Sequence, residues 1–402
     1  MTGRDERQRA TQRGWMLMRG LLSQNLVIGC SYGTFGISMI GLQERYGAGR
    51  GAISLGFSLV VLAMGLLGPL ISRSVDRFGF RGTMMVGAAL AGSGYALLAV
   101  SSQIALFFVA FGLLIGPGVA MSGTLPVGLL VGGWFPESRG RAVGLATMPI
   151  LLSLMPMLGT LVIERARLAG FYALVAILHF ALLAVIAGIR RAPVAATGVH
   201  ADAGSGGPEA GAILSRPVFW VLVLAGGLIN AVSITGVANV VSLLVEQGTS
   251  PGKAAFMASV MGVAAVCGAF SIGWLCDHVG GGRALALAAA GLGASWLALV
   301  ATPGFALTLA MLIVIGMCGA GTFPAMTVIC SRLFGQAVLG KALALFGLFT
   351  VPLTFLLPPL AGWLHDVAGG YAAVIACIVA GCAFASVTFF LIGLREQHAH
   401  SA

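Results

Sequence analysis

Charged side chains are confined to short segments that separate long apolar stretches of the chain. The 22 Lys and Arg and the 12 Asp and Glu among the 402 residues all fall in such connectors or in the two tails. A charge at the centre of a helix in hydrocarbon costs roughly 2.5–3.5 kcal/mol. Because hydrophobic residues also make up 58% of the chain, a soluble globular fold is excluded and a protein that crosses a membrane repeatedly is predicted.

Cutting the chain at the polar connectors predicts twelve membrane-spanning helices. A helix needs about 20 residues to cross a hydrocarbon core of about 30 Å, and each apolar stretch is long enough. The fold class is therefore an all-α membrane protein with twelve transmembrane helices. The predicted spans are 20–42, 52–72, 83–102, 104–131, 141–163, 168–189, 218–244, 254–275, 284–301, 305–330, 340–361 and 371–393.

Lys and Arg residues are unequally distributed between the two sides of the membrane that this span count defines. The side with both termini carries 17 of them, and the other side carries five, namely Arg45, Arg50, Arg165, Arg167 and Lys253. Positive residues accumulate on the cytoplasmic side, so both termini are expected in the cytoplasm. The basic first twenty residues lack the apolar core of a removable signal peptide.

A polar connector divides the predicted spans into two groups of six. Residues 191–216 are rich in Gly and Ala and poor in apolar bulk, which is typical of a flexible linker. The predicted domains are therefore an N-terminal half at 1–190 and a C-terminal half at 217–402, with a cytoplasmic linker between them. The halves also repeat each other, since residues 76–79 recur as 277–280 and residues 140–142 recur as 340–342.

Several short motifs accompany this repeat. They are Gly14-Trp15 and the segments 76–81 (DRFGFR), 134–140 (WFPESRG), 273–277 (GWLCD) and 362–366 (GWLHD). With these motifs the chain resembles the major facilitator superfamily over essentially its whole length. Within that family it is similar to the bacterial relatives of the monocarboxylate and oxalate/formate transporters. The resemblance implies two pseudo-symmetric six-helix halves with a substrate site at their interface, near the middle of the membrane.

The loop after the second span resembles the signature cytoplasmic loop of this family. There the acidic residue meets the N-terminal end of a helix in the opposite half, where a carboxylate is favoured by the helix dipole. The resemblance implies that Asp76 is the centre of a conformational latch, although Ser72 stands where Gly is common and Phe80 where Arg is common. The alternative is that the loop is a topology signal only. The latch residues are Asp76, Arg77, Gly79, Arg81, Arg139 and Asp277.

Neutral side chains are the candidates for substrate binding, on the spans that the resemblance places around a central cavity. The cationic residue that related carboxylate transporters carry in span eight is absent, because Gly268-Ala269 stands there. The alternative is that these polar groups only join helices across the bundle. Lone His179, in span six, is expected to be neutral and bonded to a neighbouring helix rather than a proton carrier. The candidates are Asn25, Tyr32, Thr34, Asn239, Thr322 and Phe323.

The resulting prediction is a secondary active transporter of a small organic solute, with a monocarboxylate or related organic acid favoured. It is expected to act by alternating access in a bacterial cytoplasmic membrane, as a monomer, with coupling to protons left open. One alternative is an exporter or facilitator of a neutral or amphipathic molecule. Another is a non-transporting membrane sensor on the same fold.

An enzyme is not predicted, because the spans contain no Ser/His pair, paired carboxylates or His/Cys metal cluster. The seven cysteines include no CxxC pair and are interpreted as free thiols, so no metal or other cofactor is expected. Nor does the chain contain a phosphate-binding loop of the GxxxxGK[ST] type. The expected partners are a small-molecule substrate and the lipid bilayer, with protons left open, and no nucleic acid.

Overall fold

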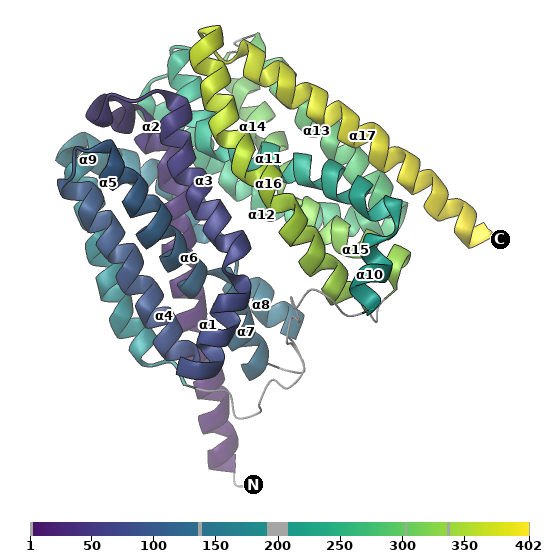
Figure 1. Ribbon diagram of the computed structural model, residues 1–402, viewed down its shortest axis with the longest axis horizontal. Coiled ribbons are helices and arrows are strands. Elements are labelled where there is room, and N and C mark those ends of the chain that lie inside the picture. The colour runs from purple at the N-terminus through teal and green to yellow at the C-terminus, as the bar shows by residue number, and fades with distance from the viewer. Residues whose placement is uncertain (1–2, 136–138, 191–207, 302–303, 336–337, 402) are drawn as a thin grey trace. The chain divides into compact units, whose positions relative to one another are not determined.

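The computed structural model describes residues 3–135, 139–190, 208–301, 304–335 and 338–401, and within these ranges the regular elements are helices (Figure 1). In chain order they are α1 (Gly3–Ile28), the π-helical segment η1 (Gly29–Gly33), α2 (Thr34–Tyr46), α3 (Arg50–Leu66), α4 (Gly68–Val100), α5 (Ile104–Val109), the π-helical segment η2 (Ala110–Ile115), α6 (Gly116–Ser122), α7 (Thr124–Trp134), α8 (Arg139–Ala146), α9 (Ile150–Ala187), α10 (Pro208–Leu214), α11 (Pro217–Glu246), α12 (Pro251–Val279), α13 (Gly281–Val300), α14 (Phe305–Ala320), α15 (Thr322–Phe334), α16 (Leu339–Ala368) and α17 (Ala372–Ser401).

The helices agree with the predicted spans once two long ones are divided at their kinks. Ten helical runs in the described residues are long and apolar enough to cross a membrane, and Arg50–Leu66 is a shorter apolar helix. Gly79, with φ 74°, divides α4, and Arg167, with φ 59°, divides α9. The part of α4 before Gly79 continues the second predicted span, and α9 contains the larger part of the fifth span and the sixth. The all-α prediction is confirmed.

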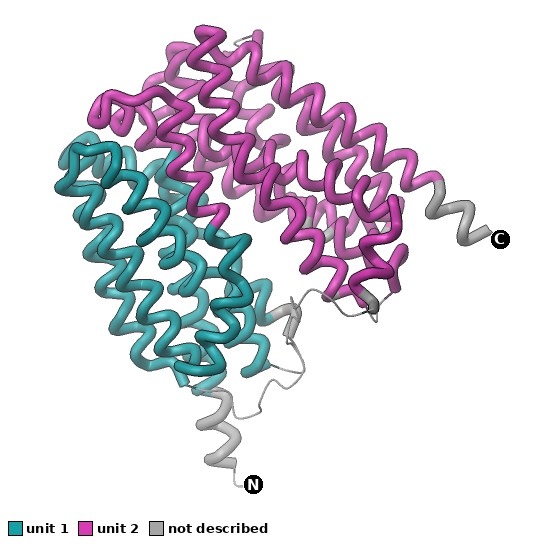
Figure 2. The backbone as a smooth tube through the Cα atoms, viewed as in Figure 1, with its two compact units in different colours: residues 1–35, 63–200 teal, residues 36–62, 201–402 magenta. Residues whose placement is uncertain are grey.

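The chain forms two compact units, coloured separately in Figure 2. Unit 1 comprises residues 1–35 and 63–200, and unit 2 comprises residues 36–62 and 201–402. Residues 36–62, which the sequence places in the N-terminal half, thus pack with the C-terminal helices. The predicted division at 190 and 217 stays a prediction. Part of the predicted linker, 208–214, forms the short helix α10.

Unit 1 is built from helices that are repeatedly interrupted. The first span changes to π-helical geometry at η1, and the fourth does so at η2 and breaks again at Gly123. The fifth span is split before Ile150, where Pro149 precedes α9. In a membrane, backbone that leaves the regular α-helical pattern is tolerated only where protein or a water-filled cavity surrounds it. The π-helical segment η1 meets this condition, because Gly29, Cys30, Ser31 and Gly33 are buried.

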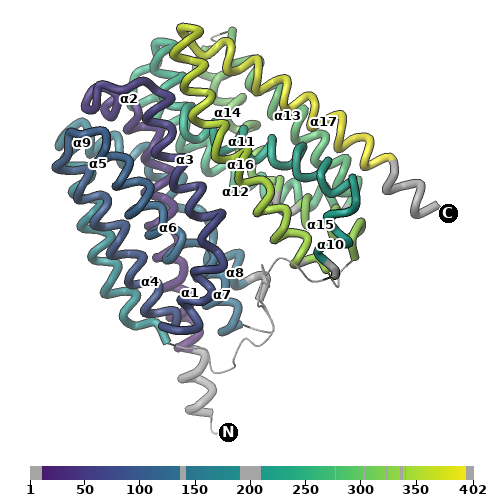
Figure 3. The backbone as a smooth tube through the Cα atoms, in the orientation of Figure 1, coloured from purple at the N-terminus to yellow at the C-terminus, as the bar shows by residue number. Residues whose placement is uncertain are grey.

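In unit 2 the start of α3 makes a tight contact with α16, a helix far from it in the sequence (Figure 3). A Cβ atom built on Gly362 would lie 2.7 Å from both the carbonyl carbon of Arg50 and the amide nitrogen of Gly51. These neighbours are backbone atoms and cannot rotate away, so only a residue without a side chain lets the two helices touch here. Elsewhere in the unit α13 packs along α17, and α12 along α14.

Candidate functional site

Three predicted substrate-binding residues lie in unit 1, on the first span. The amide of Asn25 is occupied at both ends, since its Oδ1 accepts from the backbone N–H of Leu151 at 2.8 Å and its Nδ2 donates to the carbonyl of Leu21 at 3.0 Å. Asn25 thereby caps α9 just after the break at Pro149. The Tyr32 hydroxyl lies 3.5 Å from the sulfur of Met64, and Thr34 donates to the carbonyl of Cys30. Their role in substrate binding stays a prediction.

The other three candidates lie in unit 2. Asn239 is buried in α11, where its Nδ2 donates to the carbonyl of Thr235 at 3.0 Å and its Oδ1 accepts from the Tyr371 hydroxyl at 3.2 Å. Thr322 donates to the carbonyl of Gly319 at 3.3 Å, across the junction between α14 and α15. The side chain of Phe323 lies outside the described residues. Asn239 is thus the member of this set that bonds to another span.

The predicted latch lies around a backbone turn that needs a glycine. Gly79 adopts φ 74° and ψ 168°, a conformation that side-chain-bearing residues rarely adopt. Asp76 and Arg77 stand exposed before this turn, with the Arg77 guanidinium 5.2 Å from the centre of the Phe78 ring. Arg81 borders a pocket with Arg19 and Arg190. The side chains of Arg139 and Asp277 lie outside the described residues, and the latch stays a prediction.

His179 differs from its expected arrangement. Its Nδ1 lies 2.8 Å from the carbonyl of Val175, one turn earlier in its own helix, rather than bonding to a neighbouring helix. The ring packs on Tyr95 of α4 with 4.9 Å between centroids, and Nε2 has no hydrogen-bond partner among the described residues. The expectation failed because a histidine inside a helix can reach the free lone pair of a carbonyl in its own preceding turn.

A cluster of charged residues that was not predicted from the sequence lies in unit 2. Arg50, the first residue of α3, places Nη2 3.0 Å from Oε2 of Glu246, the last residue of α11. The same Glu246 oxygen lies 2.9 Å from Nε2 of His365, near the end of α16. The other ring nitrogen of His365, Nδ1, lies 3.4 Å from Oδ1 of Asp366. We call Arg50, Glu246, His365 and Asp366 the ion-pair cluster.

Tyr371 connects the ion-pair cluster to Asn239. It immediately precedes α17, with its ring 5.0 Å from the Arg50 guanidinium and 4.6 Å from the His365 imidazole. Burial raises the pKa of Tyr371 to about 12, although the positive charge of Arg50 opposes this shift. The phenol therefore keeps its proton at neutral pH, and its O–H donates a hydrogen bond to Oδ1 of Asn239. The candidate residue Asn239 is thereby linked to the ion-pair cluster.

In the ion-pair cluster the basic side chains are less exposed to solvent than the acidic ones. The side chains of Arg50 and His365 are only 12% and 13% exposed, whereas those of Glu246 and Asp366 are 36% and 35% exposed. Nη1 of Arg50 is buried without a hydrogen-bond partner among the described residues. The side chains of Arg50 and His365 are therefore largely covered by protein, and the carboxylates reach water. A sequence signal did exist, because Arg50, Glu246 and His365 all fall at the ends of spans that share one side of the membrane.

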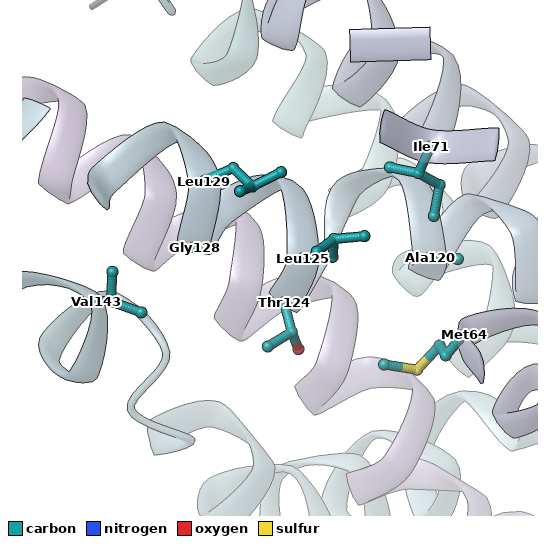
Figure 4. A pocket seen from close by; sticks show the side chains of 8 residues that line it. All are labelled: Met64, Ile71, Ala120, Thr124, Leu125, Gly128, Leu129 and Val143. Atoms are coloured by element: carbon teal, nitrogen blue, oxygen red, sulfur yellow. The ribbon is translucent and has the colours of Figure 1, made fainter. Parts of the chain in front are cut away.

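Unit 1 contains a pocket of very different character (Figure 4). It has a volume of about 390 Å³ and is lined by side chains from α3, α4, α6, α7 and α8. The Thr124 hydroxyl is the polar side-chain group in the described lining, and it accepts a hydrogen bond from Gln24 at 3.0 Å. Such a surface suits an apolar molecule or the apolar part of a larger one. The lining residues are Met64, Ile71, Ala120, Thr124, Leu125, Gly128, Leu129 and Val143.

Comparison with known proteins identifies the family. The profile of the Major Facilitator Superfamily matches residues 21–245 and 223–402, which together cover most of the chain. The chain belongs to the major facilitator superfamily. It is a multi-pass membrane protein of a transporter family and not an enzyme, and the resemblance predicted from its motifs is confirmed.

Relatives within the superfamily include monocarboxylate transporters. The chain is 29% identical to monocarboxylate transporter 13 of Rattus norvegicus over 379 residues, which is 92% of this chain and 86% of the rat protein. It is 26% identical to the Bos taurus protein of the same name, over 97% of this chain and 91% of that one. A crystal structure of a nucleoside transporter shares the fold, with a TM-score of 0.77 at 13% identity over 95% of this chain and 99% of that one.

Proposed function

We propose that this member of the superfamily is a secondary active transporter of a small monocarboxylate or related organic acid. The observation that carries the proposal is the whole-length similarity to monocarboxylate transporter 13, because the similarity covers both six-span halves rather than one shared segment. Alternating access by two such halves moves a solute without ATP. The interrupted helices support this mechanism, since breaks at η1, η2 and Gly123 are positions where a span can bend.

We propose further that the protein lies in a bacterial cytoplasmic membrane as a monomer, with both termini in the cytoplasm. The uneven distribution of Lys and Arg supports this orientation. Asp76 and its neighbours then lie on the cytoplasmic side and are proposed to latch the transporter while that side is closed. The ion-pair cluster lies on the other side, because Arg50 and Glu246 flank connectors that face away from the cytoplasm.

A neutral or amphipathic solute is the second candidate, and the apolar pocket of unit 1 favours it. Thr124 is the polar residue in the described lining, and no cation of the predicted span-eight position is available to hold a carboxylate. A monocarboxylate with a sizeable apolar body would satisfy both observations. Its tail would occupy the pocket, while the hydroxyl of Tyr32, which lies beside Met64 of the lining, would receive its polar end.

Counterflow with radiolabelled solutes in proteoliposomes separates the two candidates. Purified protein is reconstituted, loaded with unlabelled solute and tested against short-chain acids, aromatic acids and their neutral amides, with and without an imposed proton gradient. We expect an acid to exchange and to accumulate when the outside is acidic, whereas protein-free liposomes show leakage alone. Exchange of the amides together with no exchange of any acid would overturn the organic-acid proposal and favour the neutral solute.

A further inference from the structure

Arginine side chains from separate segments of unit 1 converge on one pocket, which we call the arginine pocket. Arg19 comes from α1, Arg81 from α4, and Arg190 from the residues that follow α9. The pocket has a volume of about 460 Å³, and its described lining contains no Asp or Glu. Like charges gathered around so small a space repel one another unless an anion lies between them. The arginine pocket is therefore suited to an anionic ligand.

The frame of the arginine pocket is fixed by contacts within the protein. Arg19 donates from Nη1 to the carbonyl of Gly188, and a Cβ atom built on Gly188 would overlap the guanidinium. The carbonyl of Arg190 accepts a hydrogen bond from Nε1 of Trp134 at 3.3 Å. The side chains of Arg81 and Arg190 are exposed and form no ion pair in the described part of the chain. Both are thus available to a ligand.

The arginines of this pocket stand at the level of the lipid headgroups. They lie within two residues of the ends of the predicted spans 20–42, 83–102 and 168–189, on the side with both termini. Trp15 is 57% exposed, with its ring centre 5.8 Å from the guanidinium of Arg19, and Trp is enriched at the membrane interface. Sidedness alone would require these cations to share a side, but not to converge on one pocket.

An apolar cavity of about 380 Å³ follows the arginine pocket along the same two helices. On α1 the arginine pocket ends at Arg19 and the cavity begins at Leu21. On α9 the cavity ends at Val185 and the arginine pocket begins at Ala187. We call this cavity the α1–α9 groove. Its described lining is apolar apart from Asn25, whose amide is already bonded at both ends.

Cations at headgroup level followed directly by an apolar groove match the two parts of one phospholipid. Arginine binds phosphate oxygens in pairs, and basic pockets between membrane helices bind acidic lipid headgroups. Between Leu178 and Val185 the groove follows about 10 Å of helix, which gives room for part of an acyl chain. A free phosphate would occupy the arginine pocket alone and would leave the groove without a role.

We propose that the arginine pocket and the α1–α9 groove form one binding site for an anionic phospholipid of the leaflet that faces both termini. The phosphate lies among Arg19, Arg81 and Arg190, and one acyl chain lies in the groove. The bound lipid neutralises these arginines and links the ends of three predicted spans. This site goes beyond the proposed function, because it makes the stability of unit 1 depend on the lipid composition of the membrane.

Native mass spectrometry of the purified full-length protein in detergent tests the headgroup site. Dioleoyl phosphatidylglycerol and dioleoyl phosphatidylcholine have the same chains and differ in net charge. We expect the first to bind at least about tenfold more tightly, because each arginine near an acidic headgroup adds to the attraction. Arg81→Gln combined with Arg190→Gln should remove most of this preference, and Lys at both positions should retain it. Arg73→Gln removes an exposed cation that is not part of the described lining and should leave the preference unchanged.

Ala181→Phe tests the groove, because it places a ring in the groove and leaves the arginines unchanged. The affinity for phosphatidylglycerol should fall several-fold. Ala184→Phe is the control, since it adds the same ring at an exposed position that belongs to neither described lining. Inorganic phosphate in excess should not displace the lipid.

Several results would overturn the lipid site. These are equal affinity of the wild-type protein for the two lipids, an unchanged preference in the double Gln variant, and an equal loss in Arg73→Gln. Displacement by inorganic phosphate, with Ala181→Phe binding as the wild-type protein does, would show that the arginine pocket holds a free anion and not a lipid. No transported solute is present in these measurements, so failure of the lipid site and failure of the proposed function are distinguishable.

Discussion

The ion-pair cluster of unit 2 and the apolar pocket of unit 1 show how differently one chain uses charge in two places. In the cluster, four ionisable side chains from three helices are linked by successive contacts of 3.0 Å, 2.9 Å and 3.4 Å. In the pocket, eight residues from five helices contribute one hydroxyl. The cluster is made at the ends of helices, where water is available, and the pocket is made from their interiors.

The comparison teaches which part of transport each region can serve. Ion pairs that hold helices together need groups that can stay ionised, and such groups are confined to helix ends by the cost of burying charge in hydrocarbon. Recognition of an apolar body needs shape and no charge. The two tasks are therefore expected to be separable by mutation, and the following variants test that separation from the largest expected effect to the smallest.

Gly362→Ala should have the largest effect, because it forces α3 and α16 apart. The new Cβ would lie 2.7 Å from backbone atoms of Arg50 and Gly51, and insertion into a tight contact costs about 1–3 kcal/mol. We expect uptake to fall to background and the thermal transition of the purified protein to drop. Gly381→Ala is the control, since its Cβ would meet nothing within 4 Å. A fully active Gly362→Ala protein would show that this contact is not needed.

Arg50→Gln should come next. It removes the cation that lies 3.0 Å from Glu246 and leaves that carboxylate with His365 alone. Breaking one side of a largely covered ion pair is costly because the other charge stays behind, so uptake should fall by more than about tenfold. Arg50→Lys should recover part of it. Lys253→Gln removes an exposed cation on the same side as a control, and an equal loss there would point to a general electrostatic effect.

Much of the fold was predictable because it follows from where charge is allowed. The limits of the helices agree with the apolar stretches, and the kinks at Gly79 and Arg167 fall in predicted connectors. The same residues that mark these connectors also identify the family. The local pattern could not show which residues that are distant in the sequence come into contact. His365 and Glu246 are 119 positions apart, and Asp366 and Gly51 are 315 apart, so their contacts depend on how helices pack.

The candidate site was only partly predictable for a related reason. Asn25 and Asn239 were chosen as polar residues within apolar spans, and Asn239 does bond to a residue on another span. Asn25 also bonds to another span, because it caps α9 where the broken fifth span presents a free N–H that the sequence gives no means of locating. Arg50 was counted as a topology signal, since a cation at the end of a span is explained by sidedness alone.

Gly128→Leu should have a smaller effect, and one confined to solute recognition. The nearest atom to a new Cβ is in Val143 at 3.8 Å, so the larger side chain can be accommodated by filling the pocket. Losing room for an apolar group costs affinity rather than turnover, so KM should rise about fivefold with little change in kcat. The pH dependence of uptake should persist. Gly144→Leu, on the exposed face of α8, is the control. A fall in kcat with unchanged KM would remove the pocket from the path of the solute.

Tyr371→Phe should have the smallest effect, and this effect should not depend on pH in the neutral range. The change removes the 3.2 Å hydrogen bond to Asn239 and keeps the ring beside Arg50, at a cost of about 0.5–1.5 kcal/mol. Because burial raises the pKa of Tyr371 to about 12, the hydroxyl group is protonated throughout an assay from about pH 5 to pH 9, and its stabilising contribution is lost only at higher pH. The loss of uptake in Tyr371→Phe, about twofold to threefold, should therefore be the same at every pH in that range. A loss that varied with pH would show that a second titrating group is involved. The effect could then not be assigned to the hydrogen bond between Tyr371 and Asn239 alone.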